Sequence, residues 1–392
     1  MRRMELTPRA GWVELAEKHG FVFHTENDLA YWDETHAYVF TLQQIERDLE
    51  DPTDELAALC YDAVDRVVQD ERLLTRVGVP GKFHDLVRNS WVRGDRDLYG
   101  RFDFRYDGTG PAKLYEFNAD TPTTLYESAV FQWIWLEQRR ADGTVPEGSD
   151  QFNSIHERLV EAFKGLGING PLHLAAISEC AEDFGTVDYL RDCALQAGLD
   201  ARFIHLQNVG IDASGYFTDM DDCHIEALFK LYPWEHMVED SFGALLPADR
   251  TRFIEPPWKM VAASKGILPI LWDMAPNHPN LLPTFFEDDP RAKTLTNGAG
   301  ARYVRKPIFS REGQNVTIVR PEAEGGTLSI AGDYANYPHI IQEYAPLTNF
   351  GGEYPMLGSW LVAGNAAGLG IRAEDGLVTF NGARFVPHVI IG

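Results

Sequence analysis

Two short runs of residues, 101–104 and 114–118, alternate aromatic and polar side chains. Alternation with a period of two is typical of β-strands. The stretch between the runs, residues 106–111, is rich in Asp, Gly and Pro, which are common in turns. The pattern therefore predicts a β-hairpin with a longer loop.

The predicted hairpin has an aromatic face. Residues two apart in a strand share a face of the sheet. Phe102 therefore lies on the same side as Phe104, and Tyr115 lies on the same side as Phe117. We expect these rings to point toward the core.

The opposite face of the hairpin gathers Arg101, Asp103, Glu116 and Asn118. Two carboxylates and an amide oxygen are hard ligands of the kind that Mg²⁺ prefers, and an arginine beside them suits a phosphoryl group. The same alternation is also typical of a half-buried strand with a solvated outer face. The hairpin alone leaves both interpretations open.

The composition limits the class of protein. The chain has 392 residues, of which 44% are apolar, and a formal net charge of -24. This length allows a large core in two or three lobes. The acidity argues against a nucleic-acid partner, because phosphate binding needs a basic surface. No apolar run is long enough for a transmembrane helix, so we expect no membrane partner.

The N-terminal residues show no signal-peptide pattern. The cysteines are few and have no metal-binding spacing, which suits a reducing compartment. We therefore expect a cytoplasmic protein.

Residues 9–95 are predicted to be mainly helical, because their apolar residues recur at helical spacing. The sequence around Pro52 resembles a break followed by a new helix start. The predicted helices are 43–74, interrupted at 51–54, then 84–92 and, beyond the hairpin, 125–140. Residues 143–150 are a predicted connection.

The middle of the chain alternates helices and apolar strands, which predicts a βαβ unit with parallel strands. Its predicted elements are a helix at 154–166, a strand at 172–177, a helix at 186–197 and a strand at 201–206. A GxGxxG motif is absent from it, which weakens the case for a dinucleotide site.

From residue 300 onward the chain is predicted to be rich in β-strands, and two of these carry basic residues, Lys306 and Arg372. The predicted strands are 302–307, 316–319, 339–344, 359–363 and 366–372. A loop around Gly313 precedes the second of them.

Several features suit phosphate. Lys265 and Lys306 can act as point charges, and backbone N–H groups around Gly313 can bind phosphate oxygens. The chain contains no GxxxxGK(S/T) motif and no protein-kinase motifs, so it belongs to neither of those classes. Each feature taken singly is also common in proteins that bind no nucleotide.

Together, these stretches make the chain resemble the glutathionylspermidine synthetase family of ATP-grasp carboxylate–amine ligases. The resemblance is to the single-domain bacterial type that lacks the amidase domain, and it runs from about residue 10 to 390. It is carried by the stretches YGRFDF, KLYEFNADTPTTLYES, EDFGTVDYL, FKLYPWE, EPPWKM, SKGILPILWDM, NHPNLLP, YVRKPIFSREGQNV, GSWLVAG, AAGLGIR and RFVPH.

The resemblance implies roles for the matching residues. The implied Mg²⁺ ligands are Asp103, Glu116 and Asn118, and the implied catalytic residues are Arg101 and Arg372. The implied ATP-binding residues are Arg101, Lys265, Lys306, Glu312, Gly313 and an adenine hinge of Gln342, Glu343, Tyr344 and Ala345. The implied substrate residues are Thr121, Thr123 and, in a predicted polar loop, Glu182 and Asp183.

The resemblance also implies the fold, α/β (α+β). It consists of an ATP-grasp fold, a preceding βαβ (preATP-grasp-like) lobe and a mainly helical N-terminal region that carries the hairpin. We expect three parts, an N-terminal lobe at 1–150, a substrate lobe at 151–257 and an ATP lobe at 258–392.

The implied reaction is ATP- and Mg²⁺-dependent amide formation through an acyl phosphate. The substrates would be glutathione plus spermidine, or a related pair of a thiol peptide or other carboxylate with an amine or polyamine. Two alternatives remain open: an ATP-binding protein without ligase turnover, and an ATP-dependent kinase of a small molecule. The sequence does not identify the acid or the amine.

Overall fold

The computed structural model describes residues 1–26, 29–298, 300–379 and 383–392. The helices in these ranges are α1 (Trp12–Lys18), α2 (Leu42–Ile45), α3 (Asp51–Val68), α4 (Glu71–Arg76), α5 (His84–Val92), α6 (Gln132–Ala141), α7 (Ile155–Gly165), α8 (Ala181–Gln196), α9 (Trp234–Met237), α10 (Lys259–Ala263), α11 (Ile267–Met274) and α12 (Lys293–Thr296).

The strands in the first part of the chain are β1 (Arg2–Glu5), β2 (Thr25–Glu26), β3 (Leu29–Ala30), β4 (His36–Phe40), β5 (Tyr99–Arg105), β6 (Lys113–Asn118), β7 (Leu172–Ala176), β8 (Ala201–His205), β9 (Gly210–Ile211), β10 (Phe217–Thr218) and β11 (Ala227–Lys230). Those that follow are β12 (Arg252–Ile254), β13 (Thr284–Phe286), β14 (Tyr303–Pro307), β15 (Thr317–Val319), β16 (Leu328–Ser329), β17 (His339–Glu343), β18 (Tyr354–Val362), β19 (Asn365–Glu374), β20 (Arg384–Phe385) and β21 (His388–Ile390).

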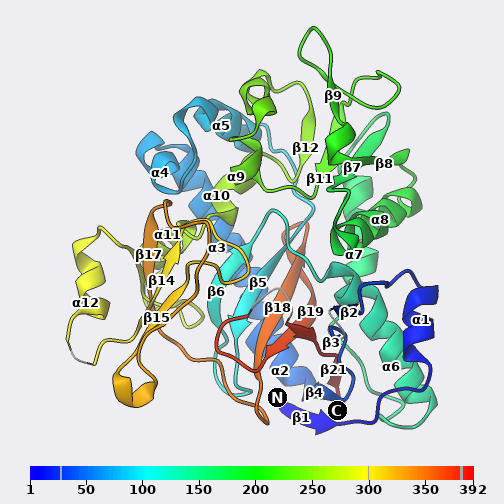
Figure 1. Ribbon diagram of the computed structural model, residues 1–392, viewed down its shortest axis with the longest axis vertical. Coiled ribbons are helices and arrows are strands. Elements are labelled where there is room, and N and C mark those ends of the chain that lie inside the picture. Colours follow the sequence, from blue (N-terminus) through cyan, green and yellow to red (C-terminus); the bar gives the residue numbers. More distant parts are fainter. Residues whose placement is uncertain (27–28, 299, 380–382) are drawn as a thin grey trace.

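The hairpin prediction is confirmed, and the hairpin is part of a larger sheet at the centre of the molecule (Figure 1). β5 and β6 are antiparallel, with Asp103 opposite Glu116 and Arg101 opposite Asn118. The sheet order is β20-β19-β18-β5-β6. The hairpin is therefore paired with strands from the far end of the chain.

One detail of the hairpin prediction is wrong. The register shifts after Asp103, so that Tyr115 has no partner in β5. Tyr115 lines the same cavity as Glu116 instead of pointing into the core with Phe117. A β-bulge of this kind turns a side chain to the other face of the sheet. Phe102 and Phe104 are buried, as predicted.

The new helix start predicted at residues 51–54 is confirmed, because α3 begins at Asp51, but the predicted break before it is wrong. A wide π turn at Glu46–Glu50 continues directly into α3, and Pro52 lies in the first turn of that helix. Proline lacks the backbone N–H that a regular helix interior needs, and a wider turn before it relieves the resulting mismatch. α3 packs behind the central sheet against β18 and β19.

The first part of the chain is less helical than predicted. β4 lies within residues 9–95 and forms a small sheet with β1 and β21, which brings the two ends of the chain close together (Figure 1). Every residue of β4 is buried, and a strand covered on both sides shows no alternation of polar and apolar residues. The helix predicted at 84–92 is confirmed as α5, and residues 127–141 form a π turn followed by α6.

The predicted βαβ unit is confirmed. β7 and β8 are parallel and belong to a four-stranded parallel sheet in the order β12-β11-β7-β8. α8 begins at Ala181, and not at Thr186 as predicted. The predicted polar loop is therefore shorter, and Glu182 lies in the first turn of a helix.

A third sheet, in the order β13-β17-β14-β15-β16, is antiparallel and lies beside the central one (Figure 1). The strands predicted at 302–307, 316–319 and 339–344 are confirmed as β14, β15 and β17. β18 begins at Tyr354, before the predicted Ser359. The division of the chain at residues 150 and 257 stays a prediction.

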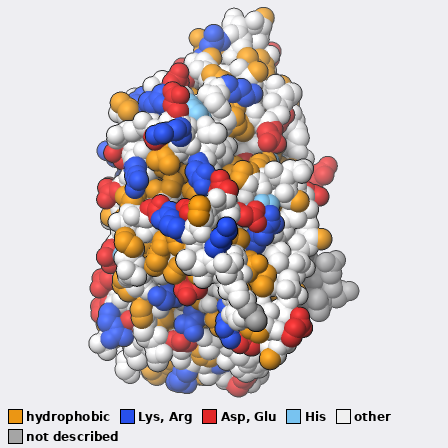
Figure 2. Space-filling model, turned by 90° about the vertical axis from the view of Figure 1, so that its left-hand side faces the viewer, with side chains coloured by type: hydrophobic (Ala, Val, Ile, Leu, Met, Phe, Trp, Pro, Cys, Tyr) orange, Lys and Arg blue, Asp and Glu red, His pale blue; other side chains and the backbone are white. Residues whose placement is uncertain are grey.

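In the described ranges, no helix has both the length and the apolarity needed to cross a membrane. On the face shown in Figure 2, basic and acidic side chains are interspersed with apolar ones. The surface visible there is therefore mixed in charge.

Candidate active site

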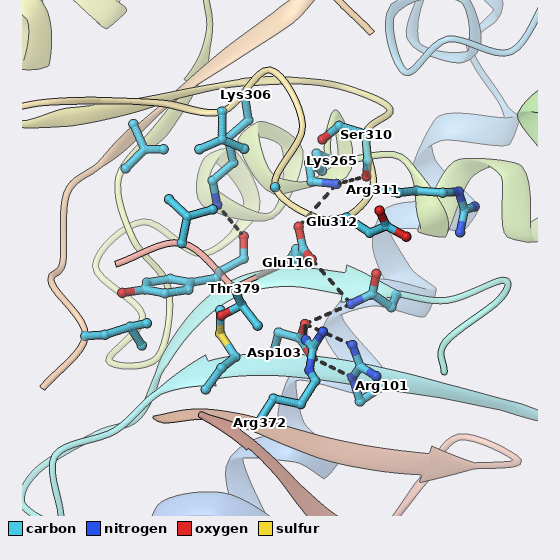
Figure 3. A pocket seen from close by; sticks show the side chains of 18 of the residues that line it. Arg101, Asp103, Glu116, Lys265, Lys306, Ser310, Arg311, Glu312, Arg372 and Thr379 are labelled. Carbon is cyan, nitrogen blue, oxygen red and sulfur yellow. Dashed lines mark hydrogen bonds and ion pairs between the residues drawn. The ribbon is translucent and has the colours of Figure 1, made fainter. Parts of the chain in front are cut away.

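On the polar face of the hairpin, Arg101 holds Asp103 through paired hydrogen bonds. Arg101 Nε donates to Asp103 Oδ1 at 2.6 Å, and Nη2 donates to Oδ2 at 3.1 Å. Asn118 Nδ2 donates to Asp103 Oδ2 at 3.1 Å and to Glu116 Oε1 at 3.4 Å. The fold thus brings the predicted metal ligands together (Figure 3).

β19 brings a second arginine to the same carboxylate. Arg372 Nη2 donates to Asp103 Oδ2 at 2.7 Å. Gly358 of β18 lies opposite Asp103, and a Cβ there would be 2.6 Å from Cδ of Arg101, so the glycine leaves room for the arginine. Burial, and then the charge of Arg101, lower the pKa of Arg372. An anion that binds here would relieve the repulsion between the two arginines.

Two lysines face the other end of the hairpin. Lys265 Nζ is 3.2 Å from Glu116 Oε2 and donates to the carbonyl of Ser310 at 2.8 Å. Lys306 Nζ donates to Gln342 Oε1 at 2.8 Å. Burial alone would raise the pKa of Glu116, but Lys265 and Lys306 lower it to about 2. Glu116 is therefore ionised at neutral pH, and burial lowers the pKa of Lys306 to about 8.

All of these side chains line one cavity between the central sheet and the sheet of β14 and β17 (Figure 3). Every residue that the sequence assigned to the site lines it, with the exception of Asp183. The lining residues from that set are Arg101, Asp103, Glu116, Asn118, Thr121, Thr123, Glu182, Lys265, Lys306, Glu312, Gly313, Gln342, Glu343, Tyr344, Ala345 and Arg372.

The glycine loop between β14 and β15 approaches the cavity with an unusual backbone. Glu312 and Gly313 both have positive φ, 52° and 69°. A Cβ on Gly313 would collide with the side chain of Val378, so the loop can pack there only with glycine. Its backbone therefore lies directly at the cavity, where N–H groups can meet an anion.

The predicted adenine hinge comprises the last two residues of β17 and the two residues that follow the strand. The Tyr115 hydroxyl donates to the carbonyl of Ala345, which connects the hinge to the hairpin. Apolar side chains that the sequence analysis did not assign to the site line this end of the cavity: Val304, Val316, Ile318, Leu347, Met356, Leu377 and Val378. In the sequence they resemble ordinary core residues, so no signal set them apart. An apolar slot of this kind suits a flat aromatic base.

The two threonines lie at the opposite end. Arg101 Nη1 donates to the carbonyl of Thr123 at 2.6 Å. Arg311 Nη1 donates to Thr121 Oγ1 at 2.8 Å. Arg311 was not among the predicted site residues, although it directly precedes Glu312 and Gly313 in the sequence. Its other nitrogen, Nη2, donates to Glu235 Oε1 at 3.0 Å, so it connects the loop to α9.

Glu182 reaches the same end of the cavity from α8, while Asp183 does not line it. Burial, and then the neighbouring charge of Asp183, raise the pKa of Glu182 to about 7. An acidic side chain that is costly to ionise gains from a cationic partner. This end of the cavity is therefore suited to an ammonium group.

The residues fit a divalent cation by the chemistry of their donors. Across the described ranges, no three His, Cys, Asp or Glu side chains gather in a way that could hold a metal. The hairpin set instead combines two carboxylates with the amide of Asn118, and hard oxygen donors of this kind suit Mg²⁺. The Glu116 side chain is 26% exposed and that of Asp103 is 1% exposed. Glu116 is thus the more accessible of the two carboxylates.

Comparison with known proteins supports the family. The profile described as glutathionylspermidine synthase preATP-grasp matches residues 3–391. A Haemophilus influenzae protein with the provisional name acid–amine ligase is 39% identical over 379 residues, which cover 92% of this chain and 91% of that protein.

Two longer relatives match over part of their length. The bifunctional glutathionylspermidine synthetase/amidase of Escherichia coli K12 is 27% identical over 385 residues, which cover 92% of this chain and 60% of that enzyme. Trypanothione synthetase of Crithidia fasciculata is 29% identical over 344 residues, which cover 81% of this chain and 51% of that enzyme.

A solved structure has the same fold. The apo form of a glutathione synthetase-like effector from Globodera pallida aligns over 98% of both chains with a TM-score of 0.58 and 11% sequence identity. The mixed α/β fold related to ATP-grasp enzymes is thus confirmed. The chain belongs to the glutathionylspermidine synthase family, which makes it an ATP-dependent carbon–nitrogen ligase.

Proposed function

We propose that this protein joins a carboxylate to an amine through an acyl phosphate, with ATP and Mg²⁺. The observation that carries the proposal is the meeting of cationic and anionic groups in one cavity. These groups are Arg101, Lys265, Lys306 and Arg372 around the carboxylates of Asp103 and Glu116.

The reaction presents a problem of charge, because an anionic carboxylate must approach a polyphosphate. A carboxylate oxygen attacks the γ-phosphorus, and ADP leaves. The amine nitrogen then attacks the acyl carbon, and phosphate leaves. Fixed cations in a cavity that excludes water stabilise the charge that spreads over the phosphoryl oxygens. Arg101 and Lys306 would offset the repulsion, and Arg372 would hold the acyl phosphate.

Asp103, Glu116 and Asn118 would hold the magnesium ion. When bound, it would neutralise charge on the ATP phosphates. This role is supported by the position of all three side chains on the hairpin, in the cavity that Lys265 and Lys306 also line. The nucleotide base would occupy the apolar slot beside residues 342–345.

The residues at the other end of the cavity indicate the class of substrates. Glu182 favours a cationic amine, and the threonines with Arg311 offer hydrogen bonds to a peptide. The names of the relatives point to glutathione and spermidine, or to a related pair of a thiol peptide and a polyamine. We propose this class of substrates, and a cytoplasmic location.

A small-molecule kinase and an ATP-binding protein without turnover are the alternatives. A ligase releases phosphate only when an acid and an amine are both present. A kinase transfers phosphate to one substrate, and a binding protein releases none. The set of charged side chains around Asp103 speaks against the binding protein, because such a site has no need to stabilise a transferred phosphoryl group.

The decisive experiment measures ADP and phosphate release by the purified protein with Mg²⁺-ATP. It uses a matrix of thiol peptides, other small peptides and polyamines, with mass spectrometry of the products. We expect release that depends on an acid and an amine together, and an amide product. Release with a single substrate and a stable phosphoester would identify a kinase and reject the ligase.

A further inference from the structure

A buried tyrosine and glutamate pair lies at the substrate end of the cavity. Tyr31 lines the cavity, and its hydroxyl donates to Glu127 Oε1. Tyr31 is 7% exposed and Glu127 is fully buried, in the π turn before α6. Neither residue has a part in the nucleotide site described above.

The Glu127 carboxylate does not use all of its hydrogen-bond acceptor sites. Its second oxygen, Oε2, finds no hydrogen-bond partner in another residue of the described ranges. The charged groups that face the pair are Glu182 from α8, Arg101 from β5 and, on the side of Tyr31, Arg372 from β19. Burial, and then the charge of Glu182, raise the pKa of Glu127 to about 8, so its ionised form takes up a proton readily and becomes more abundant as the pH rises toward 8.

The proposed reaction needs a proton acceptor at this place. An aliphatic amine is an ammonium ion at neutral pH and cannot attack until it loses a proton. The carboxylates of the hairpin are unsuited to this task, because Asp103 is bound by two arginines and Glu116 remains ionised beside two lysines.

We propose that Tyr31 and Glu127 accept the proton that the ammonium substrate loses before its nitrogen attacks the acyl phosphate. The inference rests on the proposed ligase function. The ammonium N–H gives its proton to Tyr31 Oη while the hydroxyl proton of Tyr31 passes to Glu127 Oε1. The new C–N bond then forms and the C–O bond to phosphate breaks. The second N–H proton leaves with the phosphate as hydrogen phosphate, and Glu127 later returns its proton to solvent.

The test compares two nucleophiles in Glu127→Gln, with the acid and amine that release phosphate in the matrix above, beginning with glutathione and spermidine. Hydroxylamine is largely uncharged at neutral pH, so it attacks an acyl phosphate without first losing a proton. We expect the rate with the polyamine to fall by roughly 10²–10⁴-fold, the usual contribution of a general base. Hydroxamate formation should stay close to the wild-type rate.

Tyr31→Phe provides a second variant that keeps the ring and removes the hydroxyl. It should show the same selective loss, so the inference remains testable if Glu127→Gln folds poorly. Tyr126→Phe is the matched control, because that hydroxyl donates to the carbonyl of His19 and does not line the cavity. It should keep wild-type rates with both nucleophiles.

The outcomes distinguish a failure of the proton-acceptor role from a failure of the ligase function. An active wild type whose Glu127→Gln and Tyr31→Phe variants lose both nucleophiles equally, or neither, overturns the proton-acceptor role alone. A wild type that releases no ADP with any pair overturns the ligase function and this inference together.

Discussion

Asp103 and Glu116 lie opposite each other on the hairpin, but they are held in different ways. The Asp103 side chain is 1% exposed and contacts both Arg101 and Arg372. Glu116 is more exposed and contacts Lys265. Asp103 is therefore part of the buried structure around the cavity, and the two carboxylates should respond differently to removal.

We expect Asp103→Ala to lower the free energy of unfolding by about 3–5 kcal/mol, because it leaves the buried Arg101 and the half-buried Arg372 without their common partner. Glu116→Ala should lose turnover but unfold near the wild-type midpoint. Urea unfolding and ADP release measure the two effects. Equal stability of both variants would show that Asp103 does not hold the arginines in solution.

Lys306 should make nucleotide binding depend on pH. Burial lowers its pKa to about 8, so the lysine is charged below this pH and neutral above it. A charged hydrogen-bond donor to phosphate contributes about 1.5–3 kcal/mol. The Kd for Mg²⁺-ATP should therefore rise as the pH passes upward through 8.

Equilibrium titration with Mg²⁺-ATP on both sides of pH 8 tests this expectation. In Lys306→Met the affinity should be lower and should change less with pH. Lys293→Met, which alters an exposed lysine of α12, should behave like the wild type. A wild-type Kd that is constant across this range would contradict the assignment of Lys306.

The individual side chains of the site were largely predictable, and their surroundings were not. Alternation in the hairpin placed Arg101 and Asp103 on one face, but it gave no sign of the bulge that turns Tyr115 into the cavity. Tyr31 and Glu127 carry no sequence signal, because their pairing depends on contacts between distant segments.

Strands were predictable where polar and apolar residues alternate in the sequence, even though β5 itself is almost entirely buried. β5, β6 and β14 alternate, and their positions were found. β4 is buried along its whole length, and its apolar run does not distinguish strand from helix. The sequence around Pro52 indicated a break, because proline disfavours a helix interior. In the folded chain a π turn leads into α3 without interruption.

The close packing of β18 against β5 makes Gly358 a sensitive position. In Gly358→Ala the new Cβ would meet Cδ of Arg101 at 2.6 Å. We expect a loss of about 1–3 kcal/mol of stability from overpacking, together with reduced turnover because Arg101 is displaced.

Thermal unfolding and ADP release provide the readouts, and Gly376→Ala is the matched control, since a Cβ there meets nothing within 4 Å. The control should match the wild type in both assays. Full turnover in Gly358→Ala would mean that the position of Arg101 is not critical.

The central sheet joins residues 99–118 to strands that begin at Tyr354. No local pattern predicts a pairing across such a distance, because strand alternation gives the faces of an element and not its neighbour. The resemblance to a family implied an ATP-grasp fold but not this pairing. The cavity consequently draws its lining from Tyr31 at one end of the chain to Thr379 at the other.

A nucleotide in this cavity should stabilise the protein as a unit, because it would contact residues of both sheets that line the cavity. Binding to the folded state alone raises the free energy of unfolding by about 2.7 kcal/mol when the ligand is present at 100 times its Kd. We expect the midpoint of thermal unfolding to rise with the logarithm of the Mg²⁺-ATP concentration. Lys306→Met should need a higher concentration for the same rise, whereas Lys293→Met should follow the wild-type curve. A wild-type midpoint that does not move with Mg²⁺-ATP would exclude nucleotide binding, and an equal rise in Lys306→Met and the wild type would place the nucleotide outside this cavity.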